Sequence, residues 1–400
     1  MSTQDRTSEQ ETTTKNIGLR GIVVADSTIS DVDGENGVLI YRGYDIHALA
    51  TQGTYEEVVY LLLRHKLPNY RELESLKGEL MAARSLPDSV VAVLRSLPRE
   101  AIPMDVLQAT TPVLGMNDPE LEDQTREANY RKAIRLTARL PLVVAAWHRI
   151  RNGQEVVEPR PDLSHAANFL YTLHGEVPDD ETARIMDVVL ILHAEHGFNA
   201  STFTARQIAS TRAHIYAAIT GALGSLSGPL HGGANIEVYR MLQEIGSVDR
   251  VRNYVIKTLD EGGRIMGMGH AVYKVTDPRA NILGPMAAKL AERAGNIGLY
   301  QIAEEVSKVT TEEMQKRKGR SIYPNVDFFS ALVNYLIGVP VDLFTPVFAI
   351  GRISGWAAHY LEERFGEADT KPTLYRPEAE YVGRYCGLEG CEWTPIEQRT

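Results

Sequence analysis

The 400-residue chain is 44% hydrophobic and 24% charged, which is the ordinary composition of a soluble globular protein. Its length favours two or three domains, and a core of that size needs no disulfide bonds for stability. The net charge of −10 argues against a nucleic-acid partner. Any anionic substrate must therefore bind in a local basic pocket.

The N-terminal sixteen residues are polar and contain no apolar stretch, which excludes a secretory signal. Their acidic residues Asp5, Glu9 and Glu11 are atypical of a mitochondrial transit peptide. No window holds eighteen uninterrupted apolar residues, so we expect no membrane span. We predict a disordered tail over residues 1–17 and a cytoplasmic location.

The two cysteines, Cys386 and Cys391, lie close to the C-terminus. Neither has histidine or cysteine neighbours at the spacing of metal ligands, so a zinc site is not expected. We interpret them as free thiols in a reducing compartment.

Short strands are predicted near the N-terminus, over residues 22–24 and 38–41, because both runs are rich in β-branched residues. Turn signals lie between the two runs, at Asp33-Gly34 and Asn36-Gly37. The rest of the chain has helical periodicity. Thr54 and Glu57 form a capping-box pair that begins a helix, and Pro68 is expected to end it.

Further helices are predicted from amphipathic or apolar patterns, over residues 71–84, 88–96, 127–150, 163–173, 181–195, 201–227, 325–337 and 342–364. With so many helices and so little strand, the fold class is all-α. In the predicted helix over 201–227, small residues recur every four positions, at Ala213, Ala217, Gly221 and Ser225. Such a stripe permits close helix packing, either inside the subunit or at a subunit interface.

Four polar segments interrupt this helical background. The first holds His193, Glu195, His196, Asn199 and Ser201, where one helix is expected to end and another to begin. Helix ends have unpaired backbone groups that suit polar ligands. The two histidines do not have the zincin spacing, and each by itself would more often be structural.

The second and third segments each place a histidine beside glycines that allow a ligand to approach closely. His231 lies in the string GPLHGGAN, and His270 lies in GMGHAVYKVTDPR. Arg279 ends the third segment, and arginine is the natural bidentate partner of a carboxylate. The glycine spacing matches neither a Walker A loop nor a dinucleotide-binding turn.

The fourth segment, YPNVDFFS, places Asp327 among apolar residues near a helix start. It is either a helix-stabilising N-terminal aspartate or a general base whose pKa is raised by its apolar surroundings. Four basic side chains, in residues 316–320, precede it. They form either a solvated helix end or a binding site for the phosphates of a nucleotide-bearing cofactor.

These segments, in this order, resemble the citrate synthase family. The matching strings are HGFNAST, GPLHGGAN, GMGHAVYKVTDPR, YPNVDF and the late RPEAEYVG, with earlier similarity in GLRGIVVADSTIS and GVLIYRGYDI. The similarity therefore covers residues 18 to 383. It implies an all-α, two-domain enzyme that condenses acetyl-CoA with oxaloacetate and hydrolyses citryl-CoA to citrate, as in the tricarboxylic acid cycle.

The resemblance also implies roles for individual residues. The position of Asp327 removes a methyl proton from acetyl-CoA, His231 donates a hydrogen bond to the thioester oxygen, and His270 polarises the oxaloacetate ketone. Oxaloacetate carboxylates are expected to bind at His196, Arg279, Arg352 and Arg376. Asn199 and Ser201 match positions that orient His231.

Simple chemistry agrees with these roles. The α-proton of a thioester is only weakly acidic, so a carboxylate base needs a donor that stabilises the developing oxygen charge. Three arginines suit a dicarboxylate and would be left unpaired by an uncharged ketone. No metal or redox cofactor is required. Coenzyme A contacts are expected at a further set of positions: Arg264, Met266, Gly267, Gly269, Lys274, Lys316, Lys318, Arg320 and Asn325.

The family resemblance further implies a large domain over 18–232 and 338–400 and a small domain over 233–337, with the site in the cleft. A homodimer is expected, with Arg376 reaching the partner's site, and no nucleic-acid or membrane partner. Two positions depart from many bacterial relatives: Ala271 follows His270, and Glu378 stands where a basic residue is common.

Three alternative functions are considered. A 2-methylcitrate synthase would use propionyl-CoA, although GHAVYK fits the citrate enzymes better than the GHPVY form. A citryl-CoA lyase module would need a nucleotide-dependent partner domain. A non-catalytic helical binding protein is disfavoured because His231, His270 and Asp327 are intact.

Overall fold

The computed structural model describes residues 17–19, 21–368, 371–382 and 393–399. Within these ranges the chain forms sixteen α-helices and one small three-stranded sheet, so the all-α class is confirmed. The predicted tail before residue 17 and both cysteines lie outside the described residues. No helix of the described part is long and apolar enough to cross a membrane.

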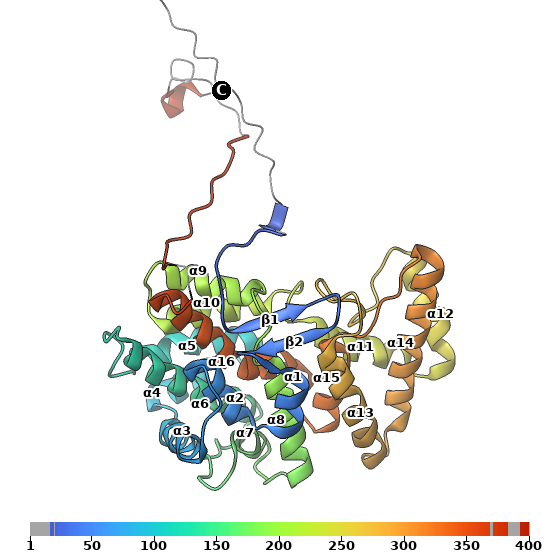
Figure 1. Cartoon of the computed structure of the whole chain (residues 1–400), viewed down its shortest axis with the longest axis horizontal. Helices are drawn as coiled ribbons and strands as arrows, with labels where there is room; N and C mark the ends of the chain where they lie inside the picture. Colours follow the sequence, from blue (N-terminus) through green and yellow to red (C-terminus); the bar gives the residue numbers. More distant parts are fainter. Residues whose placement is uncertain (1–16, 20, 369–370, 383–392, 400) are drawn as a thin grey trace, which may run out of the picture.

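The elements follow one another along the chain as shown in Figure 1. The strands are β1 (Ser30–Asp33), β2 (Val38–Tyr41) and β3 (Tyr44–Asp45), joined antiparallel in that order. The first ten helices are α1 (Ile46–Gln52), α2 (Tyr55–Arg64), α3 (Tyr70–Ala83), α4 (Asp88–Ser96), α5 (Pro103–Met116), α6 (Arg126–Arg151), α7 (His165–His174), α8 (Asp180–His193), α9 (Ala200–Ser210) and α10 (Ile215–Ser227). The next six are α11 (Ala234–Ile245), α12 (Val248–Asp260), α13 (Pro278–Arg293), α14 (Ile297–Lys318), α15 (Val326–Leu336) and α16 (Phe344–Phe365).

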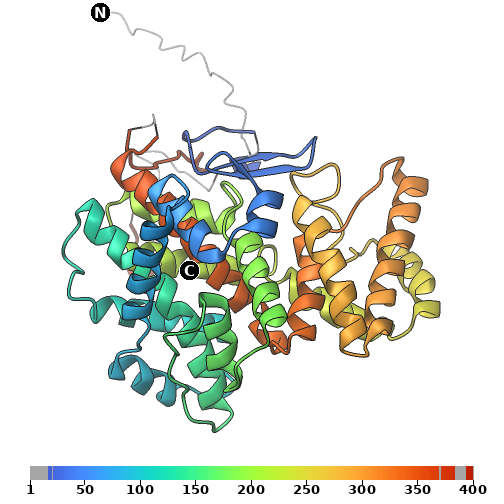
Figure 2. The same ribbon diagram turned by 60° about the horizontal axis from the view of Figure 1, so that its bottom comes forward.

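Helices α11 to α15 lie together at the right of both views, beside the other helices (Figures 1 and 2). Helix α16 returns the chain to the larger group, where it packs against α2, α5, α6, α8, α9 and α10. Every residue from Phe344 to Glu363 in α16 is buried. This helix is therefore the centre of the core, and each polar side chain on it must find a partner or a ligand.

Several predicted elements differ from the structure. Residues 22–24 form no strand, and Val23 is 85% exposed, because β-prone residues form a ladder only where a partner strand is available. The turn pairs Asp33 with Val38, and that register selects Ser30–Asp33 as the first strand instead. Helix α2 ends at Arg64 because His65 adopts a left-handed conformation, three residues before Pro68.

The single helix predicted over 201–227 is two helices, α9 and α10. The break lies at Arg212, whose φ is +67°, and at His214, whose ring nitrogen accepts the Ala217 amide as an N-cap. No glycine or proline marks this break in the sequence. Six helices were not predicted: α1, α5 and α11 to α14.

The small-residue stripe does not lie on the buried side of α10. Ala213, Ala217, Gly221 and Ser225 are all partly exposed, while the buried side carries large apolar residues such as Leu223. A Cβ at Gly221 would lie 2.2 Å from the Ile208 side chain, so this glycine permits close packing of α9 on α10. The interface alternative remains a prediction.

Helix α16 also approaches the end of α8 closely at Gly355. A Cβ on Gly355 would lie 2.2 Å from the Ala194 carbonyl oxygen and 2.5 Å from Glu195 Oε2. We expect Gly355→Ala to lower the free energy of unfolding by roughly 1–3 kcal/mol or more, because backbone must move. Gly78→Ala, on exposed α3 with nothing within 4 Å, should instead stabilise by ~0.5–1 kcal/mol. Denaturant unfolding at one protein concentration measures both, and a neutral Gly355→Ala would contradict the close packing.

Candidate active site

The turn between α8 and α9 presents His196 and is held in place by a buried carboxylate. Glu195 is fully buried, and its Oε1 accepts hydrogen bonds from the Gly197 amide at 2.6 Å, Ser30 Oγ at 2.9 Å and His359 Nε2 at 3.0 Å. Burial alone would raise the pKa of Glu195, but these partners and His359 hold it below its ordinary value. The turn therefore contains a fixed charge behind His196.

The His196 ring is 8% exposed, and its Nε2 lies 3.1 Å from the Tyr273 hydroxyl. The ring centroids of His196 and His270 are 5.2 Å apart, edge to face. Burial, followed by the charge of Arg279, lowers the pKa of His196 well below its usual value. Histidines from two separate polar segments are thus brought together as neutral groups.

His231 lies against the N-terminus of α9. The Ser201 amide donates to His231 Nε2 at 3.3 Å, and Ser201 Oγ lies 2.8 Å from the same nitrogen. The Asn199 side-chain oxygen lies 2.8 Å from Ser201 Oγ, and it accepts the Thr202 amide as the N-cap of α9. Burial and the charge of Arg352 lower the pKa of His231 to about 4. Since Nε2 accepts a backbone hydrogen bond, the proton of the neutral ring lies on Nδ1.

Two backbone amides fix the His270 ring in the opposite tautomer. The amides of Val272 and Tyr273 donate to His270 Nδ1 at 3.0 and 3.3 Å. Burial, followed by the charge of Arg279, lowers the pKa of His270 to about 4. The neutral ring therefore carries its proton on Nε2 and can donate it to a ligand.

A short antiparallel contact joins the His270 loop to the segment before Asp327. Met268 and Pro324 form an isolated β-bridge, and the Gly269 amide donates to the Tyr323 carbonyl at 2.7 Å. Gly267 has a φ of +73°, and a Cβ there would lie 2.6 Å from Val238 and 2.9 Å from Phe328. The close approach needs glycine, and it places two segments more than about fifty residues apart in sequence side by side.

Asp327 lies in the first turn of α15, as predicted. Its Oδ1 is buried and has no hydrogen-bond partner in the described part of the chain. Burial raises the pKa of the Asp327 carboxyl to about 6, although the charges of Arg279 and Arg352 oppose the shift. An unpartnered carboxylate with a raised pKa is a suitable general base near neutral pH.

Arg279 has an internal partner that the sequence interpretation missed. Its Nε and Nη2 donate to the two oxygens of Asp277 at 3.0 and 2.7 Å, and both side chains are buried. Asp277 Oδ2 also accepts the Val326 amide at 3.1 Å, so it ties Arg279 to the start of α15. The signal was present in Asp277-Pro278-Arg279, because an acid before a proline is a typical helix N-cap.

Arg352 differs from Arg279 because it has no carboxylate partner among the described residues. Its Nε donates to the His193 carbonyl at 2.6 Å, and its guanidinium lies 4.8 Å from the Phe348 ring centroid. The side chain is 1% exposed, and burial lowers its pKa to about 10. A buried cation without a counter-ion is costly, so this site is built for an anion.

Tyr273 and Trp356 are two further site residues that the sequence interpretation did not assign. The Tyr273 hydroxyl contacts His196, and Trp356 Nε1 donates to Ser201 Oγ at 3.2 Å. A tyrosine or tryptophan by itself does not indicate a functional role, because aromatic residues in helical proteins usually lie in the hydrophobic core. Only their contacts with His196 and Ser201 identify them.

The structure does not bring Arg376 to the other site residues of its own chain. Arg376 is exposed in the extended segment 371–382, which runs away from the helices in Figure 1.

The residues expected to contact coenzyme A fall into two groups, one in the loop contact and one of basic side chains. Gly267, Gly269, Met266 and Asn325 belong to the loop contact described above, with Asn325 Nδ2 donating to the Gly269 carbonyl at 2.8 Å.

Four of the five expected basic residues lie at the surface near the C-terminal ends of α12 and α14, and the fifth, Lys274, lies beside the β1–β2 hairpin. Lys274 pairs with Glu35 of the hairpin, and Lys316 pairs with Glu313 at 3.0 Å. Arg264, Lys318 and Arg320 are exposed and have no ion pair in the ranges that the structure describes. Arg317 joins the two helix ends through Asp260 at 2.6 Å, so these cations gather in one region.

The raised pKa of Asp327 predicts a stability effect that does not depend on activity. The unfolded carboxyl ionises near 3.8 and the folded one near 6, so ionisation destabilises the fold as pH rises between these values. Asp327→Asn should therefore raise the free energy of unfolding by roughly 2–3 kcal/mol above pH 6, with the gain shrinking towards pH 4. Asp105→Asn, an exposed site on α5, should give no gain; a pH-independent effect of Asp327→Asn would contradict the shift.

Comparison with known protein families gives a match over residues 18–378, to the model of the citrate synthase C-terminal domain. The citrate synthase of Haloferax volcanii is 44% identical, covering 96% of this chain and 98% of that protein. The 2-methylcitrate synthase of Shewanella oneidensis is 37% identical, covering 92% and 94%. Residue identity is therefore higher with the citrate enzyme of this pair.

Solved structures agree with the sequence relatives. Citrate synthase from Pyrobaculum aerophilum is similar with a TM-score of 0.88 at 39% identity, covering 96% of this chain and 95% of that one. Citrate synthase from Thermoplasma acidophilum, solved with carboxymethyl coenzyme A and oxaloacetate, gives a TM-score of 0.88 at 30% identity, covering 96% and 98%. Two neutral histidines of fixed tautomer, an unpartnered carboxylate and an uncompensated arginine thus lie on a fold shared along nearly the whole chain. The chain belongs to the citrate synthase family, and it is an acyltransferase of that type.

Proposed function

We propose that this protein condenses acetyl-CoA with oxaloacetate and hydrolyses the resulting citryl-CoA to citrate and coenzyme A. The observation that carries the proposal is the partly buried Asp327 carboxylate, whose Oδ1 is buried and unpartnered and which lies within electrostatic range of Arg352. A base and a free cation in one buried site fit a reaction that removes a proton beside a dianionic substrate. The relative from Thermoplasma acidophilum, bound to a coenzyme A analogue and oxaloacetate, supports the same substrates.

In the first step, Asp327 takes a proton from the methyl group of acetyl-CoA. Electron density moves to the thioester oxygen, which needs a donor. His231 supplies one, because its Nδ1 carries the proton while Ser201 occupies Nε2. Because His231 is neutral, it stabilises the enolate by a hydrogen bond without transferring its proton before the carbon–carbon bond forms.

The second step forms the carbon–carbon bond. The nucleophilic carbon attacks the oxaloacetate ketone, whose oxygen becomes an alkoxide stabilised by a hydrogen bond from His270 Nε2. This oxygen gains one proton overall, equal to the one that Asp327 removed, so both residues return to their starting states. His196, Arg279, Arg352 and Arg376 are proposed to hold the carboxylates. Arg352 has the free charge for this role, whereas Arg279 shares its charge with Asp277.

In the last step, water attacks the thioester carbonyl of citryl-CoA, and the coenzyme A thiol leaves. The proposed steps use side chains alone, without a metal or redox cofactor.

We also propose a homodimer in which Arg376 completes the partner's site. Its exposed position on a segment that leaves its own subunit is compatible with that role. Arg264, Lys318 and Arg320 are proposed to bind the coenzyme A phosphates, and the domain division at residues 233 and 337 is proposed to allow closure. A cytoplasmic location is proposed with them.

The second candidate reaction is 2-methylcitrate synthesis from propionyl-CoA. It is supported by the 37% identity to a 2-methylcitrate synthase, which is below the 44% identity to a citrate synthase. One methylene is worth about 1–3 kcal/mol of discrimination, so both substrates can react at different rates.

The proposed reaction predicts a preference between acyl substrates and a dependence of turnover on the base. We expect release of coenzyme A thiol with oxaloacetate, with a higher kcat/KM for acetyl-CoA than for propionyl-CoA. Asp327→Asn should nearly abolish turnover while binding oxaloacetate normally by calorimetry, because the base does not hold the carboxylates. A propionyl preference would select the second reaction, and loss of oxaloacetate binding would reassign Asp327.

Arg352→Leu should weaken oxaloacetate binding strongly, because a charge-assisted bidentate contact is lost. The ratio of kcat/KM for acetyl-CoA and propionyl-CoA should change little. Arg151→Leu, which removes a partly buried arginine paired with Asp342, is the matched control and should leave oxaloacetate affinity unchanged. Normal affinity in Arg352→Leu would remove this arginine from the substrate site.

Mixed dimers test whether Arg376 acts in the partner's site. Arg376→Ala and Asp327→Ala subunits are each expected to be inactive alone. In a mixed dimer purified through two different tags, one site has both residues if Arg376 acts across the interface, and about half of the wild-type activity should return if the sites are independent. A folded but inactive mixed dimer would show that Arg376 serves its own subunit.

A further inference from the structure

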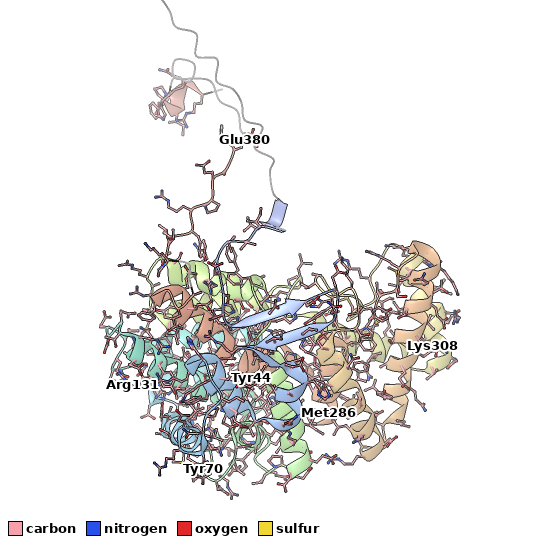
Figure 3. The ribbon with its side chains drawn as sticks, viewed as in Figure 1. Tyr44, Tyr70, Arg131, Met286, Lys308 and Glu380 are labelled. Carbon is pink, nitrogen blue, oxygen red and sulfur yellow. The ribbon has the colours of Figure 1, made fainter. Side chains whose placement is uncertain are left out.

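The segment that carries Arg376 leaves the body of the subunit at a defined anchor, Tyr375. The Tyr375 hydroxyl donates to Glu363 Oε2 at 2.9 Å, and its amide donates to Ser210 Oγ at 3.4 Å. Its ring lies 5.6 Å from the Phe203 ring. Residues 376–382 beyond it are exposed, and Figure 3 shows the segment running away from the helices to Glu380.

The anchor is itself fixed by a buried chain of charged groups. Glu363 Oε2 pairs with Arg206 Nη2 at 2.7 Å, and Arg206 Nη1 donates to His359 Nδ1 at 3.1 Å. His359 Nε2 in turn donates to Glu195 Oε1 at 3.0 Å. Arg206, His359 and Glu363 are 2%, 0% and 6% exposed, so water does not interrupt this path.

Because Glu195 directly precedes His196, this chain of charged groups connects the turn that carries His196 to the anchor at Tyr375. One end supports the turn that presents His196, and the other end holds the residue directly before Arg376. Consecutive Cα atoms lie only ~3.8 Å apart, so the position of Tyr375 limits where Arg376 can begin its reach. Binding groups that are misplaced by about 1 Å lose much of their effect.

We propose that Tyr375 is a positioning residue that aims Arg376 at the partner's active site, through its hydrogen bond to Glu363. The proposal rests on the proposed function, in which Arg376 binds an oxaloacetate carboxylate across the dimer. Tyr375 touches no substrate. We therefore expect Tyr375 to affect the affinity for oxaloacetate at the partner's site and not at the site of its own subunit.

Tyr375→Phe is the informative variant because it keeps the ring against Phe203 and removes only the hydroxyl. The KM for oxaloacetate should rise ~3- to 10-fold, less than the ~10- to 150-fold of a fully lost charge-assisted hydrogen bond, because Arg376 is displaced and not removed. The KM for acetyl-CoA and kcat at saturation should change less than twofold. Tyr375→Ala should raise the oxaloacetate KM further, since the ring contact is also lost. Tyr70→Phe, an exposed tyrosine on α3 labelled in Figure 3, is the matched control and should match wild type.

Mixed dimers with one disabled site decide between positioning and a merely structural effect. One subunit carries Asp327→Asn, so only its partner's site can turn over. Tyr375→Phe placed on the Asp327→Asn subunit should raise the oxaloacetate KM of that working site. The same change placed on the subunit with the intact Asp327 should leave the KM normal.

An equal rise in both arrangements, a rise only in the second, or no rise in either would overturn the proposal. Arg376→Ala in the same two arrangements separates this failure from failure of the proposed function. If Arg376→Ala abolishes the working site only from the Asp327→Asn subunit, the shared site stands and only the role of Tyr375 is in question. If it acts only within its own subunit, the shared site and the role of Tyr375 both fall.

Discussion

The complete burial of α16 is the constraint on which the rest of the structure depends. A helix without a solvent-facing side must pair or neutralise each of its polar side chains. Glu362 pairs with Arg206, and His359 pairs with Glu195. Trp356 donates a hydrogen bond to Ser201. Arg352 alone among the charged residues in the middle of this helix has no acidic partner in the described chain. Its positive charge is therefore left for a substrate carboxylate to neutralise.

Burial shifts the pKa of the aspartate and the pKa of the two histidines of the site in opposite directions. Burial lowers the pKa of His231 and His270, so both rings stay neutral, while it raises that of Asp327 to about 6. Backbone amides then select the tautomers, which they can do only for neutral rings. One physical cause therefore supplies two neutral donors and one carboxylate that is still ionised at neutral pH but is a stronger base than usual.

Much of the polar chemistry could be anticipated from single segments. The glycines beside His270 and the apolar residues around Asp327 indicate close approach and a raised pKa through residue type and order alone. Asp277 could not be assigned in that way, because its role arises from simultaneous contacts with Arg279 and with the Val326 amide, which belongs to a helix that starts forty-nine residues later. Similarly, the start of α10 was missed because its N-cap is His214 and not one of the usual cap residues.

The sequence by itself determined the all-α class and the capping of α2 by Thr54 and Glu57, since these depend on local periodicity and residue type. It also supplied the candidate reactive side chains, through the resemblance of four polar segments to a known family. Only the tertiary structure decided which first strand pairs with Val38–Tyr41, which arginine has a free charge, and where Arg376 lies. Strand pairing, charge neutralisation and burial each depend on residues far apart in the chain. A sequence pattern supplies the groups, but their pKa values, tautomers and partners are fixed by packing.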